Sequence, residues 1–416
     1  MKMQRNLLAV AVSATLAFAS TARAGVDEIE MLRAQIEALN KRLDQLEKQT
    51  LQAEQKAAAA EAKVQMVSNS AGSMERVVTS GNNKVRVSVS GQVNRALLWA
   101  DDGESSNVYH VDNDASSTRM RVIGEADVSD EMTVGAALEV QFESNSTANV
   151  NQLDDTGVGD DHFTQRRLEV YFDHKRYGKL WLGQGWTASE DTSEVDLSGT
   201  DLAGYSSTAD MAGGILFRDA GGALTGTAVG DVFANFDGRG RADRLRYDTP
   251  SFGGFSVAVS AIEGDAWDTA LRYSGKFGAA KVAGALAYSE PDSSTVDGQV
   301  NGSVSILFDN GVNLTLAAGE RDLASGSEDP SFYYGKLGYQ TRLNSAGMTS
   351  FSIDYHSSDD VALVGDEATS YGLQAVQKID AWATEGYVGW RTYELDRTGG
   401  DLQDVDALIA GARVKF

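Results

Sequence analysis

The last nine residues of the chain, 408–416, divide into two sets of alternating positions. One set is apolar and ends in an aromatic residue, whereas the other contains Arg413 and Lys415. Two charges in so short a stretch argue against a membrane-spanning helix, whereas Arg413 and Lys415 alternate with apolar residues as on a strand, whose successive side chains point to opposite faces. The pattern therefore predicts a strand with one face in lipid and one in water, which is the repeat of a transmembrane β-barrel.

The same alternation recurs from Lys84 to the end of the chain, in segments joined by connections of two lengths. Short connections carry turn residues, as in 250–254 and 309–311, and long ones are acidic, as in 144–161 and 395–403. At about 21 residues per strand and connection, this part predicts an all-β barrel of about 16 antiparallel strands. The apolar faces include Val87/Val89/Val93, Leu168/Val170/Phe172, Val300/Val304 and Phe351/Ile353/Tyr355.

The N-terminus has the features of a secretory signal peptide. Lys2 and Arg5 precede an apolar run over 7–19, and Ala22 and Ala24 are the small residues of a cleavage site. The run is shorter than the ~20 apolar residues that a membrane helix needs. We therefore predict that residues 1–24 are removed on export.

Removal of Lys2, Arg5 and Arg23 with the signal peptide lowers the formal net charge from −24 to −27. Such acidity argues against nucleic acid as a partner, because phosphate binding requires basic patches. The chain has no cysteine, which excludes disulfides and thiolate metal sites.

Residues 25–68 show a different periodicity. Apolar residues recur three and four positions apart from Ile29 to Val67, which is typical of a left-handed coiled coil. The residue types at the a and d positions of the heptads alone favour a two-stranded coiled coil. The segment from Arg42 to Glu47, however, resembles a signature of three-stranded coiled coils, and we therefore favour a trimer. Residues 69–83 read as a linker before the barrel at 84–416.

Four motifs, in this order, resemble the trimeric general porins of Gram-negative bacteria: 117–125, 167–172, 178–184 and 244–255. The terminal Phe416 also resembles the aromatic residue that closes bacterial outer-membrane proteins and is read by their assembly machinery. The resemblance covers about 84–416. It implies 16 strands, a homotrimer, and a water-filled pore narrowed by the third extracellular loop folded inside.

A segment of more than fifty residues between Gln184 and Arg241 has no convincing alternation, and structureless loops this long tend to be functional or disordered. We expect part of it to lie inside the barrel and part to cover the mouth. Its acidic first half would then present carboxylates to the pore; the alternative is an exposed acidic loop. The acidic candidates are Glu190, Asp191, Glu194 and Asp196.

The resemblance also implies a ladder of basic side chains on the wall opposite the loop. Acids facing arginines create a transverse field, and rings of charge set ion preference. The alternative is that these arginines are ordinary solvated charges. The basic candidates, all on the polar faces of predicted strands, are Arg119, Arg121, Arg167, Arg244, Arg246 and Arg272.

Together these features predict an outer-membrane channel for passive diffusion of small hydrophilic solutes and ions, with its coiled coil in the periplasm. No cofactor, metal or catalytic motif is expected, and the net charge favours cations. Lipid, lipopolysaccharide and the cell wall are the expected partners besides its own copies. A channel specific for a sugar or dicarboxylate, a barrel-anchored tether and a barrel enzyme are alternatives. Aromatics that could form a sugar track are Trp181, Trp186, Tyr334 and Trp390.

Overall fold

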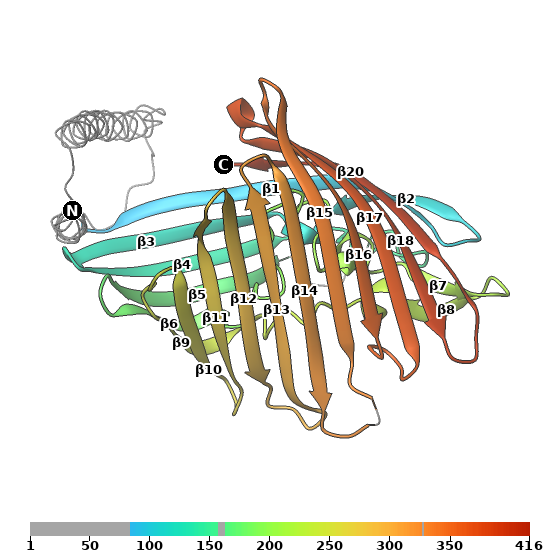
Figure 1. The fold of residues 1–416 in the computed structure, drawn as a ribbon, viewed down its shortest axis with the longest axis horizontal. Coiled ribbons are helices and arrows are strands. Elements are labelled where there is room, and N and C mark those ends of the chain that lie inside the picture. Colours follow the sequence, from blue (N-terminus) through green and yellow to red (C-terminus); the bar gives the residue numbers. More distant parts are fainter. Residues whose placement is uncertain (1–83, 157–162, 327) are drawn as a thin grey trace, which may run out of the picture. The chain divides into compact units, whose positions relative to one another are not determined.

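The computed structural model describes residues 84–156, 163–326 and 328–416. The predicted signal peptide, coiled coil and linker lie outside these residues. The described chain forms an antiparallel sheet that closes on itself (Figure 1). Its strands are β1 (Arg86–Asp101), β2 (Ser106–Asp112), β3 (Arg119–Ser129), β4 (Met132–Phe142), β5 (Phe163–His174), β6 (Gly178–Trp186), β9 (Arg241–Asp248), β10 (Phe255–Ile262), β11 (Trp267–Phe277), β12 (Ala280–Glu290), β13 (Val296–Phe308), β14 (Val312–Leu323), β15 (Ser331–Asn344), β16 (Gly347–Asp359), β17 (Asp366–Ile379), β18 (Thr384–Arg397) and β20 (Val405–Lys415).

The barrel closes between its first and last strands. β1 pairs with β20 from Gln92↔Lys415 to Asp101↔Asp406. On its other edge β1 pairs with β2 and then with β3, so these two form one barrel strand interrupted by the 3-10 helix η1 (Asp114–Ser116). Counted in this way, the described residues form a barrel of 16 strands, as predicted.

The predicted alternation also holds. Apolar residues on one face of the strands remain exposed, as at Leu168, Val300, Ile353 and Val414, because this face is turned outward from the barrel. An exposed apolar band of this kind suits contact with lipid. No helix in the described ranges is long and apolar enough to cross a membrane.

The third long connection, 187–240, lies inside the barrel. Asp268 on β11 accepts hydrogen bonds from the amides of Ala188 (3.1 Å) and Ser189 (2.9 Å). Farther along, the hydroxyl of Tyr393 on β18 donates to the carbonyl of Thr208 (2.7 Å). The loop therefore contacts opposite parts of the wall. It contains η2 (Thr208–Met211), β7 (Leu216–Asp219), β8 (Leu224–Ala228) and α3 (Val229–Val232).

A second part of this loop lies with the long connections at the barrel end. β7 pairs with β8 on one side and with β19 (Leu402–Gln403), which belongs to the connection between β18 and β20, on the other. The loop therefore lies partly within the lumen and partly at the mouth of the barrel, the two places expected for it from the sequence.

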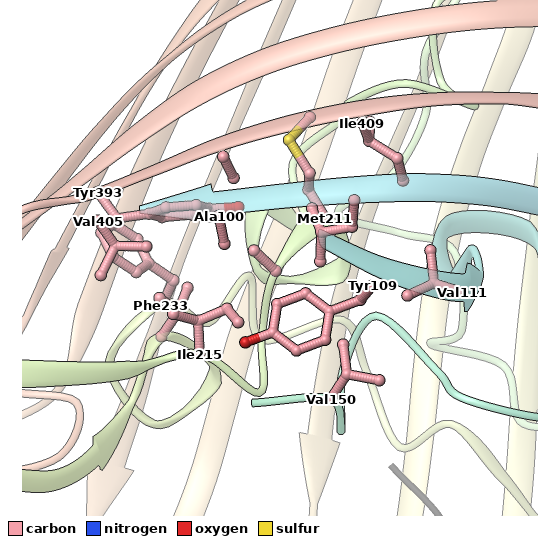
Figure 2. Close-up of a cluster of buried hydrophobic side chains, with 14 of the residues drawn as sticks. Ala100, Tyr109, Val111, Val150, Met211, Ile215, Phe233, Tyr393, Val405 and Ile409 are labelled. Atoms are coloured by element: carbon pink, nitrogen blue, oxygen red, sulfur yellow. The ribbon is translucent and has the colours of Figure 1, made fainter. Parts of the chain in front are cut away.

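A hydrophobic cluster fixes the loop to the wall (Figure 2). Met211, Ile215 and Phe233 of the loop pack with Tyr109 on β2 and Tyr393 on β18, all of them buried. Complete burial of a large apolar side chain contributes about 1.5–3 kcal/mol. Near this end of β1, β2, β18 and β20 the inward face is therefore apolar rather than polar, because the loop and not water covers it.

Residues 101–116 are polar and acidic, which predicts a long connection, but the structure places strand β2 within them. Tyr109 and Val111 on β2 are buried against the third loop, whereas the neighbouring His110 is exposed. Buried and exposed side chains therefore alternate along β2, but the buried ones pack against loop residues roughly a hundred positions away in the sequence. This contact is invisible in the local sequence.

Gly91 is the residue that makes room for the chain end. The amide of Phe416 donates to the carbonyl of Gly91, and the amide of Gly91 donates to the carbonyl of Phe416, both at 2.9 Å. A Cβ at Gly91 would lie 2.5 Å from the Phe416 ring and 2.7 Å from the carbonyl oxygen of Arg119.

We expect Gly91→Ala to destabilise the barrel by about 1–3 kcal/mol through overpacking at this closure. The measurement is the temperature at which the folded band disappears in semi-native electrophoresis. Gly386→Ala is the matched control, since nothing lies within 4 Å of a Cβ there. Equal melting of the two variants would contradict the role of Gly91 in closure.

Candidate functional site

Two cavities of the lumen, both lined by described residues, meet beside the third loop. The larger has a volume of about 760 Å³ and extends to Lys415 and Phe416 at the chain end. The smaller, about 350 Å³, is lined by loop residues and by Arg272 on β11. Both cavities are lined by Ala115, Asp191, Glu194 and Tyr205. Their junction therefore lies between η1 and the acidic part of the loop.

One wall of the larger cavity is basic and rises from β3, β4 and β5. Arg119, Arg121 and Arg166 all pair with the buried carboxylate of Glu139, with N–O distances of 3.8 Å for Arg119 and 2.8 Å for Arg166. Since no other carboxylate in the described residues lies within ion-pair distance of these three, the group carries an excess of positive charge.

A β-bulge explains why two consecutive arginines point inward. Glu139 pairs with Arg167 but its neighbour Val140 pairs with Gln165, so Arg166 is the extra residue on β5. An extra residue of this kind interrupts the alternation of faces. Arg166 consequently donates to Glu139 and to Gln141, on the same side as Arg167.

The loop supplies the opposing acidic wall. Asp191 has a positive φ of 60°, which Asp tolerates better than most residues. Asp237 accepts hydrogen bonds from the amides of Asp191 (2.7 Å) and Ser193 (2.8 Å), which holds this turn in place. Carboxylate oxygens of Asp191, Glu194 and Asp237 lie within 4.8 Å of one another.

Burial and repulsion between neighbouring acids make three carboxyl groups of the loop, those of Glu190, Glu194 and Asp237, harder to ionise. Burial raises the pKa of Glu190 to about 7, against the attraction of Arg241, whose guanidinium lies 3.1 Å away. Burial, with a further contribution from Asp191, raises the pKa of Asp237 to about 6. Burial and the neighbouring Asp237 also raise the pKa of Glu194.

Six of the predicted residues line the cavities. Arg119, Arg121, Glu190, Asp191 and Glu194 line the larger one, and Arg272, Asp191 and Glu194 the smaller. Arg272 also donates to the carbonyl of Ala188 (3.0 Å), so it holds the loop as well.

The other four predicted residues form ion pairs and line neither cavity. Arg167 and Arg244 both pair with Glu169, at 2.5 Å, and Arg246 pairs with Asp248 at 2.8 Å.

Asp196, expected to face the pore, is instead buried against Lys336 of β15 (2.7 Å). Burial alone would raise the pKa of Asp196, but Lys336 outweighs it and holds the pKa below its ordinary value. This residue attaches the loop to the wall.

Several lining residues were not anticipated from the sequence. Arg166 follows from a bulge that strict alternation cannot show, and Asp237 and Tyr205 lie in loop sequence without periodicity. Arg241, at the junction of loop and strand, could have been found as the first basic residue after the long loop. Lumen residues missed in this way are Arg166, Arg241, Asp237, Tyr205, Asp114 and Arg413.

The aromatic side chains considered for a sugar track are not stacked along the passage. Tyr334 is buried and donates to Asp354 (2.9 Å), and Trp181 donates to Asp248 (2.7 Å) beneath Lys179. Trp390 lies on the face of β18 opposite the buried Arg391. Trp186 is the one of the four that lines a described cavity.

A closed barrel with an apolar outer face and a charged lumen narrowed by an inserted loop defines an outer-membrane channel. Residues 56–397 match the family model described as Gram-negative porin, and the chain belongs to this family. Members form outer-membrane channels for passive diffusion of solutes, so the family points to a channel rather than to catalysis. No curated protein sequence matches significantly.

Solved porins share the fold at low sequence identity. The anion-selective porin from Comamonas acidovorans is 16% identical with a TM-score of 0.54, over 80% of this chain and 100% of that chain. OmpF from Salmonella typhi, solved with daunomycin, is 16% identical with a TM-score of 0.54, over 82% and 100%. OmpT from Vibrio cholerae is 12% identical with a TM-score of 0.55, over 82% and 100%.

Proposed function

We propose that this porin is a general diffusion channel whose selectivity is set where the two cavities meet. The observation that carries the proposal is the juxtaposition of the arginines around Glu139 with Asp191 and Glu194 of the loop, all lining one cavity. Opposed charges of this kind orient dipolar solutes and slow apolar ones. Charge and size at the junction, rather than tight binding, would then sort the solutes.

The test is single-channel current in a planar bilayer, repeated under a salt gradient. We expect large ohmic steps that scale with salt concentration and a reversal potential that reports the charge preference. Current that appears only when a sugar or diacid is added would replace the general channel with a specific one. Absence of current from correctly folded protein would leave a structural tether as the better explanation.

We also propose that the channel is a homotrimer fastened by the periplasmic coiled coil predicted at 25–68. A trimer form is among the solved OmpT structures of Vibrio cholerae, and the spacing from Ile29 to Val67 supports an oligomeric helix. A helix of this length would extend roughly 60 Å, far enough to approach the cell wall.

Deletion of residues 25–68, with the signal peptide retained, is expected to lower the temperature at which trimers dissociate and to reduce co-sedimentation with peptidoglycan. Conductance per barrel should be unchanged, because the residues that line the two cavities all belong to the barrel segment and are retained. Unaltered trimer stability together with unaltered co-sedimentation would refute the tether function of the coiled coil.

A further inference from the structure

We infer that the 3-10 helix η1 is a second constriction element of the channel, and that Ala115 on it limits the size of the solutes that pass. The inference rests on the proposed channel function and adds a size filter to it. Four residues line both cavities: Ala115, Asp191, Glu194 and Tyr205. Among these described residues, Ala115 alone comes from outside the third loop. A solute moving from one cavity to the other therefore passes between the loop and η1.

A break in one barrel strand places η1 in the lumen. β2 ends at Asp112, and the chain rejoins the wall only with β3. Between them the side chain of Asn113 accepts a hydrogen bond from the amide of Ala115 (3.1 Å). The carboxylate of Asp112 accepts another from the amide of Thr118 (2.9 Å), where the chain returns. Local bonds of this kind favour a tight turn over a continued strand, so the chain leaves the wall here and Ala115 reaches both cavities.

Ser116 fixes η1 to three strands of the barrel. Its carbonyl accepts hydrogen bonds from the side-chain amides of Gln92 and Asn94 on β1, both at 2.9 Å. Its hydroxyl accepts from Arg413 on β20 (2.7 Å) and from Arg119 on β3 (2.8 Å). Because Ser116 and both amides are buried, this network makes η1 rigid. A size filter requires such rigidity, since a wall that yields would admit larger solutes.

The loop side of the junction is also held in place. The hydroxyl of Tyr205 donates to the carboxylate of Asp210, which accepts a second hydrogen bond from the hydroxyl of Ser207 (2.8 Å). The side-chain amide of Asn113 donates to the carbonyl of Leu202 (2.9 Å). The residue that caps η1 is thus bonded directly to the loop, and this bond fixes the separation of the two elements.

Little space remains behind the junction. A third cavity between η1 and the loop has a volume of only about 10 Å³, and its lining includes Ala115, Leu202, Tyr205 and Met211. A single water needs about 10–15 Å³ of such volume, so larger solutes cannot enter this space. The passage between the described cavities therefore runs on the open side of Ala115, where a longer side chain would narrow it.

The experiment measures single-channel conductance and the uptake of uncharged sugars by proteoliposomes, in the parent protein and in Ala115→Phe. The added ring occupies the junction, so we expect conductance to fall by about twofold or more, because pore diameter limits the current. Uptake of a disaccharide should fall more than uptake of a monosaccharide. Uncharged sugars report size alone, since the charges at the junction do not act on a net charge in them.

The double variant Ala115→Phe/Tyr205→Ala tests whether the effect arises from space at the junction. Tyr205→Ala alone should raise conductance, and the double variant should recover most of the parent conductance and disaccharide uptake, because one ring then replaces another. Ala115→Leu should give an intermediate loss, and it keeps the test available if Ala115→Phe does not fold.

The matched control is Ala375→Phe on β17. Ala375 pairs with the exposed, outward-facing Phe351, so the same ring is added outside the lumen and should leave both measurements unchanged. Folding of each variant is checked by heat-modifiable electrophoretic mobility.

Parent-like conductance and disaccharide uptake in folded Ala115→Phe or Ala115→Leu would overturn the inference while leaving the channel intact. A loss that is equal for both sugars and is not recovered in the double variant would overturn it as well, because it would show a general disturbance and not a narrower junction. Absence of conductance from folded parent protein would instead overturn the proposed channel function and this inference with it.

Discussion

Replacing Lys336 with methionine is expected to release the acidic part of the third loop from the barrel wall. Lys336 is buried and donates to Asp196 (2.7 Å), Thr200 (3.2 Å) and the carbonyl of Gly204 (2.5 Å). Without Lys336 the carboxylate of Asp196 would remain buried and unpaired. Removing one partner of a buried ion pair typically costs about 3–5 kcal/mol.

Release of the loop in Lys336→Met should appear as faster amide hydrogen exchange in residues 190–210. It should also make the single-channel current noisier, because the loop then moves within the passage. The control is the double variant Lys336→Met/Asp196→Asn, in which no buried charge is left unpaired; replacing both partners is often nearly neutral. We expect it to recover most of the protection. Exchange in Lys336→Met as slow as in the parent would refute the anchoring role of this pair.

Lowering the pH from 8 to 5 is expected to shift the ion preference of the channel towards anions. An isolated carboxylic acid remains ionised over this range, since its pKa lies near 4. The pKa of Glu190 is raised to about 7 and that of Asp237 to about 6, so both lose their charge as the pH falls through these values. The arginines opposite stay charged, and the balance at the junction becomes more positive.

One unit charge at about 4 Å changes the energy of a passing ion by about 1 kcal/mol in water, which is about fivefold in permeability. The measurement is the reversal potential under a potassium chloride gradient at each pH. The double variant Glu190→Gln/Asp237→Asn, which removes both titrating groups, should show an anion shift already at pH 8 and a much smaller pH dependence. Asp309→Asn, in an exposed turn, is the control. A parent reversal potential constant from pH 8 to 5 would contradict the proposed field.

The strand pattern, the approximate count of 16 and the long internal loop were predictable because alternation is a local property. Residues such as Leu168 and Ile353 must face lipid if Glu169 and Asp354 face the lumen, and successive side chains of a strand decide this within a few positions. The same argument assigned Arg119 and Arg121 to one face of their strand, and both line the larger cavity, since the β3–β4 register is regular there.

The pairing of charges inside the barrel depends instead on contacts between distant segments. Sequence alone cannot indicate that Asp196 meets Lys336, 140 positions away, whereas Asp191 and Glu194 remain in the passage. Nor can it show that a bulge turns Arg166 inward, since the bulge is a property of the β4–β5 pairing.

The sequence by itself therefore determined a closed barrel with an apolar outer face, a polar interior and an acidic insertion. Only the tertiary structure decided which charges line the passage. The physical reason is that alternation sets the face on which a side chain lies, but not its partner. An ion pair such as Arg244–Glu169 or Lys336–Asp196 forms only when chain closure brings two segments within a few ångströms.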